Sequence, residues 1–414
     1  MQSEILTRLR ASFEYHTGLM EIPKNTKKFI LTHFNFLLFT TIPGVFINTF
    51  FFRQDGKIST VAIYNAIMVF GLSLVMHISS KISLKKSPVF VLRIGVAVFN
   101  VFYITLLLLQ NNAARFMPLL GILNAIACGF YWQGYNELVK LCTDENTFDR
   151  TVSLIGLSNA VVTLVVPILS GLLITYCPGQ LGYSLIFALS FISSLYTTYL
   201  TTRIDKVKIT GQSNIPGAYR YIFTNKRVMY ATFGEVMRGI KNMAFPLFLN
   251  IIFFKLVSNE AILGVNNMLC GFASIISFII AGKLIRPGNR LKCILTSSLI
   301  SIVLYLPLFF YMNSALIFIL AIVNAFISAY IDNPAIAIFY ALFEKPVEGI
   351  AFSQIMAARE VFFAVGRVIG LVLLIIMAQS TFTLALFAFI LNFSTALTWV
   401  FYRAAAKENN KGGL

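Results

Sequence analysis

The sequence predicts an all-α membrane protein with twelve transmembrane helices. Of its 414 residues, 58% are hydrophobic and only 12% are charged, and the mean hydropathy is +0.80. A soluble domain is typically about 25% charged, because polar side chains must cover its surface. The apolar residues also fall into separate stretches of about 20 residues, the length that a helix needs to cross a bilayer.

Six apolar stretches make up the first half of the chain, near residues 29–52, 60–80, 89–109, 116–140, 152–176 and 180–201. Polar or turn-forming segments separate most of them, at residues 53–57, 85–88, 110–112 and 177–179. Residues 1–28 are polar and lack the apolar core of a cleavable signal peptide. We therefore expect a cytoplasmic N-terminal segment over 1–28, followed by a bundle of six helices over 29–202.

Six further stretches make up the second half, near residues 229–254, 261–284, 293–312, 315–342, 351–378 and 381–402. The longest polar connection of the chain, residues 203–228, separates the two halves and contains Gly211, Pro216 and Gly217. We expect a cytoplasmic linker over 203–228, a second six-helix bundle over 229–402 and a short cytoplasmic tail over 403–414.

Basic residues are divided unevenly between the two sides of the predicted spans. Of the 33 Lys and Arg residues, five lie within the spans, and one side holds only Arg53, Lys57, Arg115 and Lys255. Because cytoplasmic loops are rich in Lys and Arg, the other side is predicted to be cytoplasmic. An even number of spans places both termini on that side of the plasma membrane. This topology accounts for the net charge of +17, so we expect no binding to nucleic acid.

The two halves share short sequence matches at nearly one offset. Residues 46–53 match residues 248–255, Asn65 matches Asn267 and Lys81 matches Lys283, each 202 positions apart. Residues 122–125 match residues 322–325 at an offset of 200. Matches at equivalent spans predict a parallel repeat, in which the two bundles are related by an axis along the membrane normal.

Twelve spans, a six-plus-six repeat and a long basic central loop resemble the major facilitator superfamily. The resemblance in architecture covers nearly the whole chain. It implies two six-helix bundles and secondary transport by alternating access. The Lys-, Asn-, Ile- and Phe-rich composition also resembles an uncharacterised branch of transporter-like proteins in Gram-positive bacteria.

Two sequence motifs of that superfamily are partly present. The loop motif Gly-x-Leu-x-Asp-Arg-x-Gly-Arg-Arg is approximated at residues 282–290, where Gly282, Gly288 and Arg290 fit and the Asp is absent. The antiporter motif Gly-Pro-x-x-Gly-Gly is approximated in span 5, where Pro167 and Gly171 fit. The second match favours export only slightly.

Ionisable side chains inside the spans are candidate functional residues, because each is costly in a bilayer. The candidates for proton coupling or for a gate of ion pairs are Asp332, Glu235, Glu360, Arg359, Arg238 and Arg367. By helical spacing, Glu235, Arg238 and Asn242 share one face of span 7, and Lys241 points away from it. Gly366 and Gly370 form a stripe on span 11 that is suited to close helix packing.

Two interpretations of these charges remain open: a cytoplasmic gate of ion pairs, or carboxylates that carry protons. Among the carboxylates Asp332 ranks first, since no cation lies within reach along its own helix, followed by Glu235 and Glu360. Glu137 and Arg93 lie near span ends, where we expect them to reach the membrane surface.

Polar residues within the spans are candidates for lining a substrate cavity. They are Asn48, Asn124, Trp132, Gln133, Lys241, Asn242, Asn250, Asn324 and Asn333. For the asparagines, hydrogen bonds between helices are the favoured alternative. The segment 332–334 ends in a proline and is predicted to interrupt span 10 beside a polar cavity. Arg238 and Lys241 could bind an anion, but neutralisation by Glu235 or Asp332 is favoured.

The leading functional hypothesis is a secondary active transporter of a small molecule, with proton-coupled export of an amphiphilic or drug-like compound. The alternatives are an uptake symporter for a small anionic solute and, from another class, a membrane sensor or membrane-embedded enzyme. No Walker A or catalytic motif is present in the sequence, so we expect no enzyme. The five cysteines form no CxxC pair, and we expect no metal, no cofactor and a monomer in the bilayer.

Overall fold

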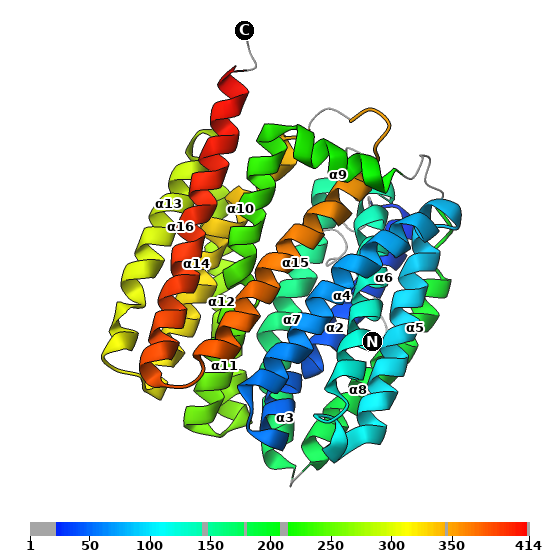
Figure 1. Ribbon diagram of the computed structural model, residues 1–414. Coiled ribbons are helices and arrows are strands. Elements are labelled where there is room, and N and C mark those ends of the chain that lie inside the picture. Colours follow the sequence, from blue (N-terminus) through cyan, green and yellow to red (C-terminus); the bar gives the residue numbers. More distant parts are fainter. Residues whose placement is uncertain (1–21, 143–147, 178–179, 208–213, 344–346, 412–414) are drawn as a thin grey trace, which may run out of the picture.

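The computed structural model describes residues 22–142, 148–177, 180–207, 214–343 and 347–411. All regular elements in these ranges are helices, which confirms the predicted fold class (Figure 1). Most of the N-terminal segment 1–28, residues 208–213 of the linker and residues 412–414 of the tail lie outside the described residues. The proposed domain boundaries therefore stay predictions.

The first bundle consists of six transmembrane segments. The first segment is made of α2 (Lys24–Gly44) and α3 (Phe46–Asp55). The others are α4 (Ile58–Lys85), α5 (Pro88–Leu109), α6 (Met117–Leu141), α7 (Phe148–Tyr176) and α8 (Leu181–Thr202). The linker helix α9 (Ile215–Thr224) follows and lies across one end of the molecule (Figure 1). We call this the α9 end.

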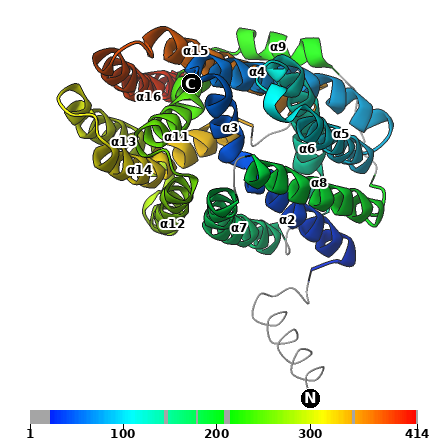
Figure 2. The same cartoon turned by 90° about the horizontal axis from the view of Figure 1, so that it is seen from below.

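The second bundle repeats the arrangement of the first. Its first segment is made of α10 (Lys226–Asn242) and α11 (Ala244–Val257). The others are α12 (Glu260–Leu284), α13 (Arg290–Leu304), α14 (Ser314–Ala341), α15 (Phe352–Met377) and α16 (Thr381–Lys411). Figure 2, a view along the helix axes, shows the two bundles side by side. They contact each other mainly through α4 with α15 and α7 with α12.

Eleven of the transmembrane segments are long and apolar enough to be recognised as spans within the described residues. The twelfth, α6, contains Asn124, Gln133 and Glu137, which lower its hydropathy. It packs closely against α4 and α5. The twelve-helix count of the sequence prediction is consistent with this arrangement.

The first segment of each bundle is broken, which the sequence prediction missed. The break lies at Val45 in the first bundle and at Met243 in the second, so that each predicted span becomes two helices. A proline lies near each break, Pro43 and Pro246. Proline lacks the amide hydrogen that would bond to the preceding turn, and its ring crowds that turn.

Span 10 differs from its prediction in the opposite way. The helix α14 runs unbroken from Ser314 to Ala341 with Pro334 inside it, so the predicted interruption at residues 332–334 is wrong. A transmembrane helix can accommodate a proline because neighbouring groups satisfy the freed carbonyl. By contrast, α13 ends at Leu304, before the predicted end of span 9, and a short 3-10 turn (Leu306–Phe309) that contains Pro307 follows it.

The internal repeat predicted from the sequence is visible in matching hydrogen bonds. In the first bundle Asn65 donates to the Asn48 side chain at 2.8 Å and to the Val61 carbonyl. In the second bundle Asn267 donates to the Asn250 side chain at 3.2 Å and to the Leu263 carbonyl. Within each bundle, the same contact thus joins the first transmembrane segment to the second.

The helix α9 packs on the second bundle and also contacts the first. Its Ala218 and Ile222 are buried against Ile355 and Ala358 of α15. On the other side, the Tyr219 hydroxyl lies 3.0 Å from Nε2 of His77 in α4. Although it belongs to the linker, α9 is therefore anchored to both bundles.

Candidate functional site

A network of buried charges lies inside the second bundle, around Glu235 of α10. This carboxylate is fully buried. It forms ion pairs with Arg238 at 2.8 Å and with Arg359 of α15, and the Tyr402 hydroxyl of α16 donates to it at 2.6 Å. Charge-assisted hydrogen bonds from three sides compensate for the loss of water around the carboxylate.

Asp332 of α14 joins the same network. Arg238 Nη1 lies 2.7 Å from its carboxylate, so this arginine bridges two acids on two helices. The sequence prediction ranked Asp332 first as a proton carrier because its own helix offers no cation. The premise holds for α14 itself, but the neighbouring helix α10 supplies a cation. The side chain of Asp332 remains 31% exposed.

A second ion pair lies on α15, between Glu360 and Arg367. Arg367 donates to Glu360 at 2.7 Å and to the Asn242 side chain at 3.0 Å. Both arginines also contact the ring of Phe363, whose centre lies 4.2 Å from Cζ of Arg238 and 4.0 Å from Cζ of Arg367. A cation over a ring face at this distance gains a favourable cation–π interaction.

These ion pairs all form within the second bundle. The gate hypothesis expected charges that pair when the cytoplasmic end closes. In this conformation none of the six candidate side chains reaches a partner in the first bundle, as far as the described residues show. Their roles in gating or coupling stay predictions.

The close approach of α10 and α15 depends on the glycine stripe predicted in span 11. A Cβ atom on Gly366 would collide with the Val236 carbonyl oxygen, and one on Gly370 with the Ile240 carbonyl oxygen. Because glycine has no Cβ, the two backbones lie in contact here. This contact brings Arg359 and Arg367 beside α10.

Lys241 lies on a small pocket next to the network. The pocket has a volume of about 190 Å³ and is lined by Arg238, Lys241, Asn242, Pro246, Ser328, Ile331, Asp332 and Thr395. The sequence analysis expected Lys241 to point away from Arg238 and Asn242, which is wrong. The residues 238 and 241 lie three positions apart and share a helix face, and all three side chains line this pocket.

Lys241 forms no direct ion pair within the described part of the chain, although the carboxylate of Asp332 lines the same pocket. Its side chain is only 8% exposed, its ammonium lies 5.0 Å from the centre of the Phe245 ring, and it forms no ion pair or hydrogen bond there. By contrast, Arg238 pairs with Glu235 and Asp332. Arg359 pairs with Glu235, and Arg367 pairs with Glu360. With Lys241, the site therefore has four bases and three acids.

The other predicted cavity residues are distributed over both bundles. Asn48 and Asn250 form the interhelical bonds described above, and Asn124 donates to the Tyr64 hydroxyl at 2.7 Å. The buried Asn324 Oδ1 has no hydrogen-bond partner within the described residues. Asn333 lines a separate hollow of about 260 Å³ with Ile336, Ala337 and Tyr340. None of these five asparagines lines the Lys241 pocket.

Trp132 and Gln133 of α6 contact different parts of the protein. Trp132 packs with Leu72 and Met76 of α4 and with Ala357 of α15, where the two bundles meet. Gln133 is buried and donates to the Glu137 carboxylate at 2.7 Å. The two side chains therefore do not form one site.

Glu137 and Arg93 both make contacts within the first bundle. Glu137 is only 7% exposed and accepts a second hydrogen bond from Ser83. Arg93 is partly buried and donates to the Thr201 carbonyl at 2.8 Å, where it caps the end of α8. The position of a residue near the end of a span predicts its depth in the membrane, but it does not predict the direction in which the side chain points.

The loop-motif residues lie at the α9 end between α12 and α13. Gly282 is in the last turns of α12, Gly288 is in an exposed 3-10 turn (Pro287–Asn289), and Arg290 begins α13. Within the described residues the Arg290 side chain has no ion pair or hydrogen bond. Their function stays a prediction.

An ion pair that the sequence analysis missed joins the two bundles at the end opposite α9. Arg53 of α3 pairs with Glu260, the first residue of α12, and the Tyr183 hydroxyl of α8 lies 3.0 Å from the same carboxylate. The Thr175 hydroxyl also accepts from the Ala261 amide at 3.0 Å. The sequence contained one indication of this contact: basic residues are scarce on this side, and Arg53 is one of only four there.

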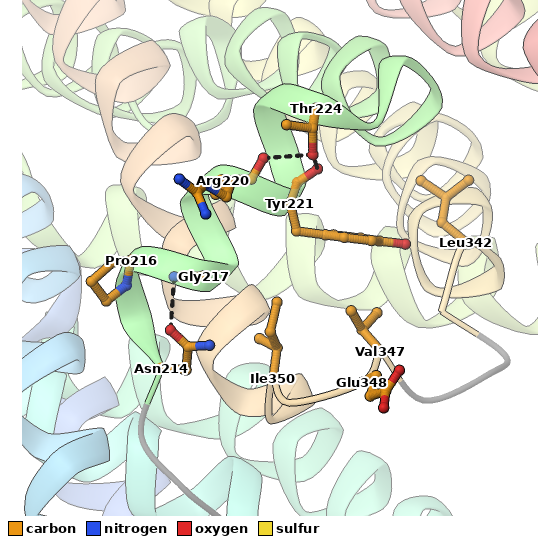
Figure 3. Close-up of a pocket in the computed structure, with 10 residues that line it drawn as sticks. All are labelled: Asn214, Pro216, Gly217, Arg220, Tyr221, Thr224, Leu342, Val347, Glu348 and Ile350. Atoms are coloured by element: carbon orange, nitrogen blue, oxygen red, sulfur yellow. Dashed lines mark hydrogen bonds between the residues drawn. The ribbon is translucent and has the colours of Figure 1, made fainter.

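A larger hollow lies at the α9 end, between α9 and the connection from α14 to α15 (Figure 3). Its volume is about 900 Å³, and Arg220, Tyr221, Leu342 and Glu348 are among its lining residues. In Figure 3 Arg220 and Glu348 point to different sides of the hollow. It is separate from the buried charges of the second bundle.

Sequence comparison identifies the family to which this architecture belongs. The profile of the Major Facilitator Superfamily matches residues 29–312, more than half of the chain. The uncharacterised protein YqgE of Bacillus subtilis (strain 168) is 24% identical over 336 residues, which are 80% of this chain and 77% of that protein. This relative agrees with the predicted Gram-positive branch.

Solved transporter structures have the same fold. The nucleoside transporter NupG has a TM-score of 0.69 at 14% identity and covers 93% of this chain and 100% of its own. A D-xylose–proton symporter has a TM-score of 0.72 at 13% identity, with 91% and 96% covered. Together with the twelve helices and the family match, they establish what kind of protein this is: the chain belongs to the Major Facilitator Superfamily and is a multi-pass membrane transporter, not an enzyme.

Proposed function

We propose that this transporter moves a small solute bearing a negatively charged group, and that protons drive its uptake. The observation that carries the proposal is Lys241, a buried cation that lines a pocket and forms no ion pair or hydrogen bond within the described residues. A buried charge without a partner is costly. An anion that enters the pocket would supply the missing partner.

The size and the lining of the pocket support a small polar solute. A volume of about 190 Å³ corresponds to about six water molecules in the liquid. The side chains of Asn242, Ser328 and Thr395 add hydrogen-bonding groups beside the ammonium. This surface suits a carboxylate or a phosphate group.

Export of an amphiphilic compound, the leading hypothesis from the sequence, has less support from this site. An amphiphile would need a large apolar surface, and the pocket beside Lys241 has a volume of only about 190 Å³. The partial antiporter motif at Pro167 and Gly171 was its only direct signal. The anionic alternative is therefore the function that we favour.

Proton coupling follows from the energetics of anion uptake. We place the α9 end in the cytoplasm of a plasma-membrane protein, on the basis of the charge asymmetry of the loops. An inside-negative potential opposes the entry of an anion by about 2.3 kcal/mol per charge and 100 mV. A proton that moves together with the anion removes this electrical cost.

The cross-bundle contact at Glu260 supports a gate for alternating access. Arg53 and Tyr183 of the first bundle both bind this carboxylate of the second bundle. We propose that this contact closes the end opposite α9 in the present conformation. It must then break when the solute is exchanged on that side.

The anion proposal can be tested by replacing Lys241 with methionine. Purified wild-type protein in detergent should melt at a higher temperature with at least one of acetate, succinate and inorganic phosphate, at matched ionic strength. At a hundredfold excess over the dissociation constant, the gain is about 2.7 kcal/mol. Lys241→Met should abolish this gain, because the methionine side chain carries no charge.

The matched control is Lys255→Met, which removes an exposed lysine of the same transmembrane segment. It should keep the full gain from the anion, and glucose should stabilise neither protein. Equal stabilisation of Lys241→Met and the wild type would contradict the anion pocket. So would a wild type that none of the three anions stabilises.

The gate proposal predicts that Glu260→Gln opens the end opposite α9. Loss of the charge removes the ion pair with Arg53, so the population of conformations separated at that end should rise severalfold. Spin labels at Lys57→Cys and Lys255→Cys, with the five native cysteines replaced, would report the distance by pulsed electron resonance. Both positions are exposed and lie on opposite bundles.

Asp205→Asn serves as the control for the gate. It removes an exposed ion pair with Lys28 within the first bundle, at the α9 end. The distance distribution should then stay that of the unmodified protein. A distribution that Glu260→Gln leaves unchanged would show that the ion pair does not hold the gate.

A further inference from the structure

Glu137 differs from the other acids inside the spans. Its carboxylate is buried, with 7% exposure, near the α9 end of α6. The hydroxyl of Ser83 on α4 donates to Oε2, and Gln133 Nε2 donates to Oε1 at 2.7 Å. Both partners are neutral, and the described residues supply no cation to this carboxylate.

The three other intramembrane carboxylates all have arginine partners. Glu235 has two, Asp332 shares Arg238, and Glu360 pairs with Arg367. A cation beside a carboxylate favours its charged form. These three acids are therefore poorly suited to bind a proton in this conformation, although the sequence analysis ranked them first.

The charged groups of the helices around α6 are engaged elsewhere or exposed. Lys81 and Lys85 of α4 are exposed, and His77 contacts Tyr219. Arg93 of α5 caps the end of α8, and His33 of α2 binds the Tyr131 hydroxyl at 2.8 Å. The remaining groups, whose side chains lie outside the described part, are Lys140 of α6 and Asp149 and Arg150 of α7.

We propose that Glu137, with Ser83 and Gln133, is a proton-binding site in the first bundle, separate from the anion pocket of the second. This assignment rests on the proposed coupling to protons. The bond that forms on protonation is an O–H bond on the Glu137 carboxylate, and the proton comes from water at the α9 end.

The hydroxyl of Ser83 allows the site to hold either protonation state. Toward the carboxylate it donates its hydrogen. When the acid is protonated, the Ser83 oxygen can accept a hydrogen bond from the carboxyl group, since a serine hydroxyl is both a donor and an acceptor. Its own hydrogen can then turn to a carbonyl of the preceding turn of α4, a common arrangement for serine in helices. The Glu137 carboxyl group therefore keeps the same two partners in either state.

The location of Ser83 links this site to the contact between the bundles. It lies on α4, the helix that packs against α15 of the second bundle. The residues Leu72 and Met76 of α4 contact Ala357 of α15, two residues before Arg359. Protonation of Glu137 changes how α4 is held against α6, and α4 passes any shift to the second bundle.

Infrared difference spectroscopy of the purified protein tests the proposal without a substrate. Between about pH 9 and about pH 6, where exposed carboxyl groups stay ionised, the wild type should gain a carbonyl band from a protonated, buried carboxyl group. The band should be absent from Glu137→Gln. It should persist in Glu360→Gln, which removes a carboxylate paired with an arginine, and in Lys140→Gln. An unchanged band in Glu137→Gln would overturn the proposal.

Ser83→Ala provides a second variant that keeps the carboxyl group, in case Glu137→Gln does not fold. It removes one donor to the charged form, so the midpoint of the band should move to higher pH by about one unit. A midpoint equal to that of the wild type would count against the site.

The proton site and the anion pocket can fail separately. A band that maps to Glu137, with no anion effect at Lys241, would keep the proton site and reject the proposed solute class. An anion effect without a band at Glu137 would keep the solute class and reject this coupling residue.

Discussion

Replacing Glu235 with glutamine should destabilise the protein by about 3–5 kcal/mol, because it leaves buried positive charge without its counter-ion. The carboxylate is fully buried and pairs with Arg238 and Arg359, whose side chains are 5% and 11% exposed. The amide of glutamine has nearly the same shape but no charge. Arg359 would lose its only ion pair within the described residues.

The measurement is the melting temperature of purified protein in detergent, followed by fluorescence-detected size exclusion. The control is again Asp205→Asn, because its partner Lys28 and Asp205 itself are 39% and 69% exposed. An exposed pair of this kind contributes at most about 1 kcal/mol. If Glu235→Gln lowered the melting temperature no more than this control, the buried network would not be a main source of stability.

The second large effect is expected for Gly370→Ala. The new Cβ would overlap the Ile240 carbonyl oxygen, so α10 and α15 would have to move apart. Overpacking of this kind costs about 1–3 kcal/mol. The Arg367 hydrogen bond to Asn242 spans the same helix pair, so its geometry should also be lost.

Gly156→Ala is the matched control within another transmembrane helix. A Cβ at Gly156 of α7 would meet no atom within 4 Å. Alanine has the higher helix propensity, so this variant should be unchanged or slightly more stable. A Gly370→Ala protein that melts like Gly156→Ala would show that the crossing of α10 and α15 is loose enough to accept a side chain.

The sequence predicted the fold well because the bilayer imposes its own length and polarity on each helix. The spans, the linker and the repeat follow from apolar stretches and from paired positions such as Asn65 and Asn267. Local backbone breaks were harder to predict. Pro43 and Pro246 lie beside breaks, yet Pro334 lies within a continuous helix, because the helices that surround each proline determine the outcome.

The sequence predicted the members of the charged site but not their partners. Glu235 and Arg238 are neighbours along one helix, so spacing predicted their contact. Asp332 meets Arg238 across 94 positions of sequence, and no periodicity within α14 contains that information. Likewise, the three arginines form ion pairs and Lys241 forms none within the described residues. This difference depends on how three helices meet in space.

The attachment of α9 has a consequence for how the chain is made. The backbone amide of Asn214 binds the Gln354 side chain of α15, 140 residues further along the chain. At about 5–20 residues per second, a ribosome needs on the order of ten seconds to make that distance. During this interval the first bundle is complete, while Ala218 and Ile222 lack Ile355 and Ala358 of α15, against which they are later buried. A chaperone or the insertion machinery would have to shield this short helix until α15 has been inserted.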